Sequence, residues 1–133
     1  MEKTFSEQGF VKGLDGRKLL IGASARDTKA GRRWERSLHK RLNVLLQAAG
    51  AVVMKKALVL LDDVLHSSGL TPGVDYEFVI NCHDEYQIEA LEKHAEFVGK
   101  CARQAIIDAG VHFKMRCPMD GEYKIGNNWA ETH

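Results

Sequence analysis

The tripeptide His83-Asp84-Glu85 carries the side chains of this sequence best suited to chemistry on phosphates. It separates two segments, 76–82 and 86–90, whose β-branched and aromatic residues predict the two strands of a hairpin. A carboxylate at the bend of a hairpin is accessible to Mg²⁺, which prefers hard oxygen ligands and keeps several waters. Asp84 is therefore a candidate ligand of a catalytic metal ion.

A two-ion site, with ions roughly 3.5–4 Å apart, needs more than this tripeptide. Neighbouring residues in an extended chain point to opposite faces, so Asp84 and Glu85 cannot readily hold the same pair of ions. A second carboxylate must come from elsewhere, and the remaining candidates in the sequence are Asp15, Asp62, Asp63 and Asp120. None of these follows a predicted strand in the same way, and a solvated turn remains the alternative interpretation of the tripeptide.

Basic residues are concentrated in one part of the chain. Residues 17–41 contain nine Lys or Arg and two acidic residues, a local charge of +7, which leaves −6 for the remainder. Such a block beside an acidic body indicates a site for a polyanion, although a solvated loop is the alternative. Residues 23–34 are predicted to be a Gly- and Ser-containing loop, and the candidate phosphate contacts are Arg17, Arg32, Arg33 and Arg36.

A stripe of short polar side chains follows the basic block. His39, Asn43 and Gln47 lie at i, i+4 and i+8 of a helix predicted over residues 35–65, beside an apolar stripe. Such groups can hydrogen-bond to base and sugar edges in the minor groove, where A·T and T·A pairs look alike. An ordinary hydrated helix face is the alternative.

The elements that must position these residues follow an order typical of an α+β fold. We predict an antiparallel sheet with one long and one shorter helix packed on one face. In chain order, the expected elements are two short strands within 9–22 joined at Leu14-Asp15-Gly16, the long helix, a break at 67–73, the hairpin of 76–90, a helix that Gly110 ends, a strand over 111–117 and a short strand around Tyr123.

Length and composition indicate one domain of ordinary globular character. The chain has 133 residues, of which 44% are hydrophobic and 28% charged. We find no segment with the length and apolarity of a membrane span and no secretory h-region, and we expect no membrane partner. Three cysteines without a Cys-x-x-Cys pair favour free thiols in a reducing compartment, so a cytoplasmic location is expected.

Four segments, taken together and in order, resemble the C-terminal palm segment of family A (polymerase I type) DNA polymerases, most closely the bacteriophage branch. The resemblance extends from about residue 9 to residue 133. The matching segments are the hairpin Gly13–Lys18, the helix segment Leu42–Ala51, His83-Asp84-Glu85 as motif C, and the stretch from Lys124 through His133.

The resemblance implies roles for the matched residues. Asp84 would be a ligand of the catalytic Mg²⁺ ions, Glu85 a supporting carboxylate, and His83 a neighbour of the primer terminus. Asn43 and Gln47 would contact the minor groove near the primer–template junction. The implied partners are a DNA primer–template and, in the complete enzyme, a deoxynucleoside triphosphate.

Two positions depart from the family pattern. His39 falls in the minor-groove stripe, where other members often carry Arg. The basic segment 23–36 is longer than in the phage relatives, so the resemblance assigns it no contacts.

The resemblance also implies what this sequence lacks. The family's second metal-binding aspartate, in motif A, has no match, and neither do the fingers, thumb and exonuclease regions. We therefore expect residues 1–133 to be one partial domain that cannot synthesise DNA alone and needs a companion polymerase fragment. The start at Met1 and the retained Asp84, Asn43 and Gln47 motivate the hypothesis of a split phage or prophage polymerase. The alternatives are a non-catalytic DNA-binding module, an inactive prophage remnant, or a partner-binding protein that keeps the fold.

Overall fold

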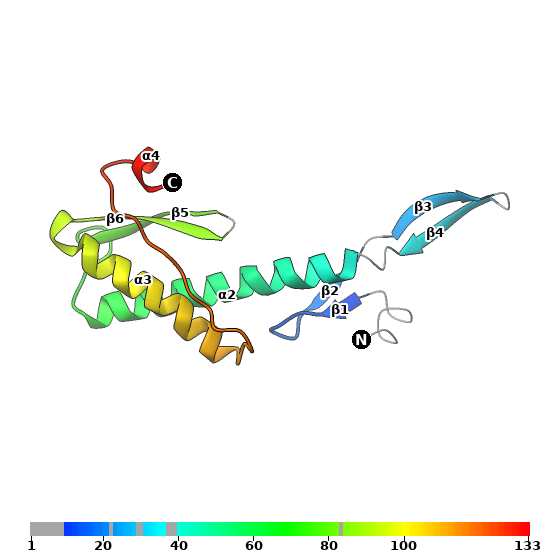
Figure 1. The fold of residues 1–133 in the computed structure, drawn as a ribbon, viewed down its shortest axis with the longest axis horizontal. Coiled ribbons are helices and arrows are strands. Elements are labelled where there is room, and N and C mark those ends of the chain that lie inside the picture. Colours follow the sequence, from blue (N-terminus) through cyan, green and yellow to red (C-terminus); the bar gives the residue numbers. More distant parts are fainter. Residues whose placement is uncertain (1–9, 22, 29–30, 37–39, 83) are drawn as a thin grey trace. The chain divides into compact units, whose positions relative to one another are not determined.

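The computed structural model describes residues 10–21, 23–28, 31–36, 40–82 and 84–133 (Figure 1). For residues 23–36 the description is confined to the backbone. The chain divides into two compact units, Met1–Val52 and Val53–His133, and a long helix, α2 (Lys40–Ser67), contributes to both. Each unit is described by itself.

The first unit begins with a short hairpin of β1 (Phe10–Lys12) and β2 (Lys18–Leu20), which pair antiparallel. Gly16 adopts φ +82° in the connecting turn, a conformation that glycine reaches without a Cβ clash. This hairpin confirms the prediction of two short strands within 9–22. It contributes to a small apolar cluster made of Val11, Leu19, Ile21, Val44 and Leu45.

A second hairpin occupies the basic block. β3 (Ala23–Thr28) and β4 (Gly31–Arg36) pair antiparallel in continuous register, from Ala23 with Arg36 to Thr28 with Gly31. The prediction of a loop over 23–34 was wrong. Neither strand carries the alternating apolar residues by which a half-buried strand is recognised in a sequence, whereas cross-strand backbone hydrogen bonds form regardless of side-chain type.

Helix α2 starts later than the sequence suggested. Its predicted start, Glu35, lies on β4, so that boundary was wrong. The helix stops where the sequence predicts a break: Gly69, at φ +82°, donates to the His66 carbonyl, and Leu70 donates to the Leu65 carbonyl. These two bonds form a Schellman motif, which satisfies carbonyls at the end of the helix.

By length and composition alone, helix α2 is long and apolar enough to cross a membrane. Of the 18-residue stretch of α2 that meets this criterion, 17% is buried. The prediction that the sequence has no segment with the length and apolarity of a membrane span was wrong. Helix α2 reaches this apolarity because residues 42–54 contain no charged side chain. An amphipathic helix that packs within a domain passes the same test, so length and composition do not separate the two cases.

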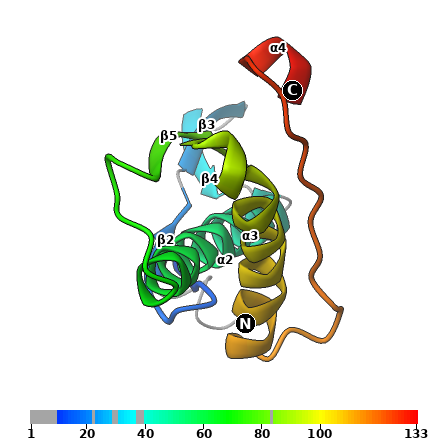
Figure 2. The same cartoon turned by 90° about the vertical axis from the view of Figure 1, so that its left-hand side faces the viewer.

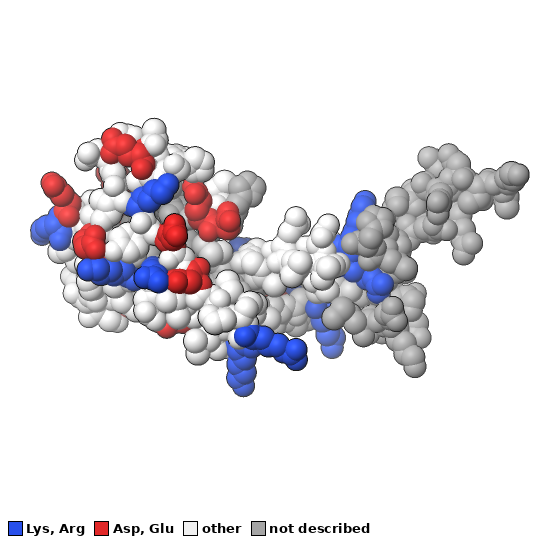
Figure 3. All heavy atoms as spheres, in the orientation of Figure 1, with Lys and Arg blue, Asp and Glu red and all other residues white. Residues whose placement is uncertain are grey.

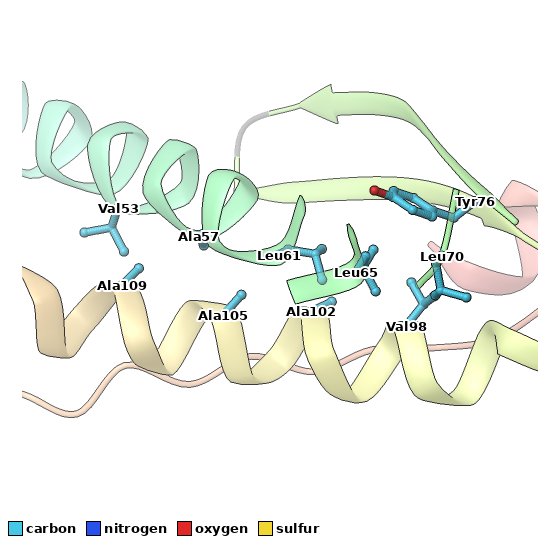
Figure 4. Close-up of a cluster of buried hydrophobic side chains, with 10 residues drawn as sticks. All are labelled: Val53, Ala57, Leu61, Leu65, Leu70, Tyr76, Val98, Ala102, Ala105 and Ala109. Atoms are coloured by element: carbon cyan, nitrogen blue, oxygen red, sulfur yellow. The ribbon is translucent and has the colours of Figure 1, made fainter. Parts of the chain in front are cut away.

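The core of the second unit lies between α2 and α3 (Glu92–His112) (Figure 4). In Figure 4 the two helices run in opposite directions, with Val53 facing Ala109 and Ala57 facing Ala105. Three alanines on α3 leave room for the larger side chains of α2, so the two helices approach closely. The buried cluster consists of Val53, Ala57, Leu61, Leu65, Leu70, Tyr76, Val98, Ala102, Ala105 and Ala109.

One face of a third hairpin covers this core. β5 (Tyr76–Cys82) and β6 (Glu85–Ala90) pair antiparallel, and Phe78, Tyr86 and Ile88 pack against the cluster. The predicted α+β class, with one long and one shorter helix on one face of antiparallel strands, is confirmed. Within the described residues the strands form three separate two-stranded sheets.

The chain after α3 differs from the prediction. α3 continues through Gly110 and ends at His112, and the chain turns at Lys114, which has a φ of 52° and donates to the Val111 carbonyl. The predicted strand over 111–117 and the short strand around Tyr123 are absent from the described chain. Both predictions were wrong because Val111 and His112 continue the helix and the residues beyond them find no ladder partner.

Residues 113–133 form what we call the C-terminal segment. In Figures 1 and 2 it runs along α3 and ends in a single turn of helix, α4 (Trp129–Thr132), beside the β5–β6 hairpin. Gly99 and Gly110 of α3 make space for it. A Cβ atom on Gly99 would lie 2.6 Å from Tyr123 Cε2, and one on Gly110 would lie 2.8 Å from Met119 Cβ. Glycine at these two helical positions is therefore a packing requirement, despite its poor helix propensity.

Candidate functional site

The tip of the β5–β6 hairpin holds the candidate metal ligand. Cys82 pairs with Glu85, so only residues 83 and 84 form the connection. His83 lies outside the described residues. Asp84 is exposed, and within the described chain no hydrogen bond or ion pair engages its carboxylate. A free carboxylate on a short two-residue link is accessible to a cation and is held by strands on both sides.

A β-bulge at Val79 sets which residues face the core near this tip. Phe78 pairs with Ile88, but Ile80 pairs with Gln87, so β5 carries one residue more than β6. The extra residue reverses the alternation of β5 beyond Val79. As a result Phe78 faces the helices, whereas Ile80 lies with Gln87 on the opposite face.

Tyr86 anchors the tip from the core side of the hairpin. It packs against the buried cluster, and its hydroxyl donates to the Ala102 carbonyl of α3 at 3.2 Å. Burial raises the pKa of Tyr86 to about 12, so the phenol stays neutral and keeps its role as a donor at ordinary pH. Because Tyr86 is two residues from Asp84, this contact ties the tip to a rigid helix.

Glu85 is engaged on the opposite face. Its Oε1 accepts from Gln87 Nε2 at 3.5 Å and lies 3.3 Å from His133 Nδ1. Asp84, in the turn before β6, has no such partners, so the two adjacent carboxylates have different environments. The difference agrees with Asp84 and Glu85 having separate roles.

Two of the other candidate carboxylates, Asp62 and Asp120, have local partners, whereas Asp63 is exposed on α2. Tyr76 donates to Asp62 at 2.8 Å, and burial together with that hydrogen bond raises the pKa of Tyr76 to about 12. Both guanidinium contacts from Arg103 to Asp120 are 2.8 Å, and they lower the pKa of Asp120 to about 2. Among the described residues, no group of three or more His, Cys, Asp or Glu side chains gathers to hold a metal ion.

Asp15 is occupied in a different way. It accepts from the backbone amide and the side chain of Arg17 in the turn between β1 and β2. Partial desolvation, which acts in the opposite direction, is outweighed by these hydrogen bonds, so the pKa of Asp15 lies below its usual value. Arg17 is thus exposed but paired, which weakens its case as a phosphate contact.

The candidate DNA contacts fall in the first unit. Asn43 and Gln47 are exposed on α2, one turn apart, as predicted. Asp84 belongs to the other unit, Val53–His133. His39 lies outside the described residues, and the remaining candidates, Arg32, Arg33 and Arg36, are on β4, where the backbone alone is described.

Charge is distributed unevenly over the described surface. Figure 3 shows acidic and basic side chains interspersed over the second unit, and a surface without charged groups along part of α2. In the sequence, residues 42–54 of α2 contain no charged residue, and within this run Leu42 and Leu46 are 63% and 62% exposed. Leu42 and Leu46 lie one helical turn apart and so form a small exposed apolar surface on α2.

Sequence reasoning missed one group of residues at this site. Gln87, Thr132 and His133 form a polar network with Glu85 on the outer face of β6. The alternating polar residues of β6 could have indicated a polar face. No sequence signal joins Glu85 to His133, which is 48 positions away.

Comparison with solved structures defines the class of fold. The chain is similar to the polymerase domain of Pol1 from M. smegmatis, a structure that holds a DNA primer–template and a dNTP. The TM-score is 0.57 with 18% sequence identity, over 80% of this chain and 18% of the other chain. The fold is therefore that of part of a polymerase domain.

Sequence comparison then gives the family. The model of DNA polymerase family A matches residues 1–131, and the chain belongs to this family. It is 36% identical over 127 residues to the DNA-directed DNA polymerases of Enterobacteria phage T3 and Escherichia phage T7. Each alignment covers 93% of this chain and 16% of the phage polymerase, so the chain spans about one sixth of these relatives. The expected resemblance to phage members of the family is confirmed.

Proposed function

We propose that this chain supplies the part of a DNA polymerase that carries one metal-binding aspartate, Asp84, and acts with a companion polymerase fragment. The observation that carries the proposal is the free, exposed Asp84 carboxylate on a two-residue link, in a chain of family A. The proposed reaction of the assembled enzyme is attack of a primer 3′-hydroxyl on a deoxynucleoside triphosphate, with release of pyrophosphate. Replication in the cytoplasm of a host cell is the setting this implies.

The residues of the tip fit Mg²⁺ in part. Asp84 offers hard oxygen donors, whereas three of the other aspartates considered for the second position, Asp15, Asp62 and Asp120, are engaged elsewhere, and the fourth, Asp63, lies on α2. A second aspartate would come from the companion fragment. With both aspartates present, Mg²⁺ would stabilise the attacking and leaving oxygens of phosphoryl transfer.

The chain's other residues would bind and orient the primer–template. Asn43 and Gln47 present short polar groups one helical turn apart, which suits hydrogen bonding to minor-groove acceptors. His39 is proposed to extend this stripe and His83 to lie against the primer terminus. Arg32, Arg33 and Arg36, with Arg17 in a smaller role, would neutralise phosphates.

The companion fragment would also cover the apolar face of α2. Leu42 and Leu46 are exposed here, and a polymerase fragment that supplies the rest of the palm accounts for them better than a membrane does, because the chain belongs to a DNA polymerase family. In this proposal, α2 packs against the companion fragment through Leu42 and Leu46 and does not cross a membrane.

The test is complementation of primer extension. This chain is mixed with a fragment of a phage family A polymerase that carries motif A and the fingers, and extension of a labelled primer is followed with Mg²⁺ and all four dNTPs. We expect extension by the pair and loss of at least a hundredfold with Asp84→Asn, because removal of a group that stabilises transition-state charge costs that much. Asp108→Asn, at an exposed aspartate on α3, is the matched control and should leave extension unchanged. A pair no more active than either fragment alone refutes the proposal.

A second candidate function rests on the basic block alone. With a local charge of +7, residues 17–41 could bind DNA while Asp84 stays idle. A non-catalytic module or an inactive prophage remnant predicts that Arg32→Gln with Arg33→Gln weakens DNA binding and reduces its salt dependence, whereas Asp84→Asn changes nothing measurable. The effect of Asp84→Asn on extension therefore separates the two functions.

A further inference from the structure

A polar network links the C-terminal segment to the hairpin tip. Thr132 Oγ1 donates to Gln87 Oε1 at 3.2 Å, Gln87 Nε2 donates to Glu85 Oε1 at 3.5 Å, and His133 Nδ1 lies 3.3 Å from the same Glu85 oxygen. The network is on the face of β6 that points away from the core. It ends at the residue next to Asp84.

This network is too exposed to hold the C-terminal segment in place. The side chains of His133 and Glu85 are 68% and 38% exposed, and exposed pairs of this kind contribute about 0–1 kcal/mol. Ordering a free chain end costs more than that. The contacts therefore form because other residues already hold the segment.

Three anchors hold the segment along α3. Met119 packs against Gly110, and Tyr123 packs against Gly99 while its hydroxyl donates to Glu96 at 2.8 Å. Between them, Asp120 receives both guanidinium contacts from Arg103. With the segment held at these three places, its end is already near the tip, so the contacts with Glu85 and Gln87 cost little further conformational entropy.

The last turn is also shaped locally. Asn128 accepts from the Glu131 amide at 3.2 Å and donates to the Glu131 carboxylate at 2.7 Å, an N-cap that starts α4. The Trp129 and His133 rings meet edge to face, with centroids 6.0 Å apart. The capped turn thus places Thr132 and His133 against β6, where they contact Gln87 and Glu85.

We propose that the C-terminal segment is a positioning device for the hairpin tip and that His133 is its positioning residue. Glu85 is the first residue of β6 and pairs with Cys82, so a restraint on Glu85 acts directly on the two-residue link that carries Asp84. The segment thereby narrows the orientations of the proposed metal ligand. This inference rests on the proposed function for its purpose, but its structural part is measurable without catalysis.

The first experiment measures amide hydrogen exchange at residues 84–87 of the full chain. His133→Ala should accelerate exchange there by about two- to fivefold, which corresponds to an exposed pair of roughly 0.4–1 kcal/mol. His133→Asn should stay near the parent rate, because its Nδ2 can donate where His Nδ1 lies. His112→Ala, which removes an exposed histidine from the end of α3, is the control and should leave these amides unaffected. Unchanged exchange in His133→Ala, or equal acceleration in His112→Ala, overturns the proposal.

The second experiment uses the complemented polymerase. His133→Ala should raise the Mg²⁺ concentration for half-maximal extension by about two- to fivefold, with primer–template affinity unchanged, and His133→Asn should restore it. Equal Mg²⁺ dependence in all three proteins contradicts a positioning role. If the pair extends no primer at all, the proposed function fails, while the exchange experiment still decides whether His133 holds the tip.

Discussion

The packing of the Tyr123 ring against Gly99, in the space we call the Gly99 notch, predicts that Gly99→Ala destabilises the fold, whereas alanine at an ordinary helical position stabilises it. Alanine normally stabilises an exposed helical position by roughly 0.5–1 kcal/mol relative to glycine. At Gly99 the added Cβ would lie 2.6 Å from Tyr123 Cε2 and 2.9 Å from Cγ. Both distances are shorter than real contacts of a Cβ atom, and an aromatic ring cannot bend away from them. The ring must therefore leave the notch.

The destabilisation expected for Gly99→Ala follows from the packing and the hydrogen bond that Tyr123 loses. Overpacking typically costs about 1–3 kcal/mol, and the exposed hydrogen bond from Tyr123 to Glu96 is lost as well. Subtracting the gain in helix propensity leaves a net destabilisation of roughly 1–2 kcal/mol for Gly99→Ala. Gly50→Ala in α2 is the matched control, because nothing lies within 4 Å of its added Cβ. It should stabilise the chain by roughly 0.5–1 kcal/mol.

Urea unfolding followed by far-ultraviolet circular dichroism measures both effects. Limited trypsin digestion adds a local readout, because release of the C-terminal segment should speed cleavage after Lys124. In a Tyr123→Ala background the notch is empty, so Gly99→Ala should become stabilising by roughly 0.5–1 kcal/mol. The reasoning is refuted if Gly99→Ala stabilises the parent chain as Gly50→Ala does, or if the Tyr123 background leaves its effect unchanged.

Three further predictions concern ionisation and surface contacts. Arg103, with the Gly121 amide, lowers the pKa of Asp120 to about 2, so the stability from the Arg103–Asp120 pair is present above about pH 4 and is lost as the pH falls from about 4 to about 2. Arg103→Gln should raise the pKa of Asp120 toward its ordinary value, measured by NMR. Tyr86→Phe should lower the free energy of unfolding by about 1 kcal/mol at neutral pH. Because burial raises the pKa of Tyr86 to about 12, the parent chain loses stability between about pH 10 and 12, and this loss should be smaller in Tyr86→Phe. Replacing Leu42 and Leu46 by Glu should reduce self-association of the chain, measured by light scattering.

Each of these has a control and a contradicting outcome. An Asp120 titration that is the same with and without Arg103 would show that the pair does not form in solution. An alkaline unfolding curve unchanged by Tyr86→Phe would show that this phenol is accessible to water. Val111→Glu, at a residue 72% exposed outside α2, is the control for association; if it disperses the chain as well as the α2 changes do, the face of α2 is not the contact surface.

Local sequence patterns predicted several elements correctly. The turn at residues 13–17, the end of α2 near Gly69 and the two strands flanking residue 84 all have their signals in adjacent residues: a glycine at positive φ, or a run of β-branched and aromatic residues. The family resemblance also came from such ordered local segments, and the match over residues 1–131 confirms it. The metal and DNA roles of individual residues remain predictions.

Where local signals were weak or misleading, the predictions failed. The strands β3 and β4 carry mostly polar residues, so the pattern that marks a buried strand face is missing and a loop was predicted. Gly110 suggested the end of a helix, but its role is to admit Met119, and Lys114 makes the turn instead. At Gly110 the deciding partner, Met119, lies beyond the residues from which a helix end is predicted.

By itself, then, the sequence determined the class of fold, the family and the place of Asp84 between two strands, because these depend on contiguous residues. Tertiary structure alone decided that Glu85 meets His133, that Tyr123 occupies the Gly99 notch, and that Asp62 and Asp120 are engaged away from Asp84. These contacts join positions 14 to 48 residues apart. Their physical cause is the packing of the C-terminal segment and the hairpin on the helices, and no spacing of residue types along the chain encodes it.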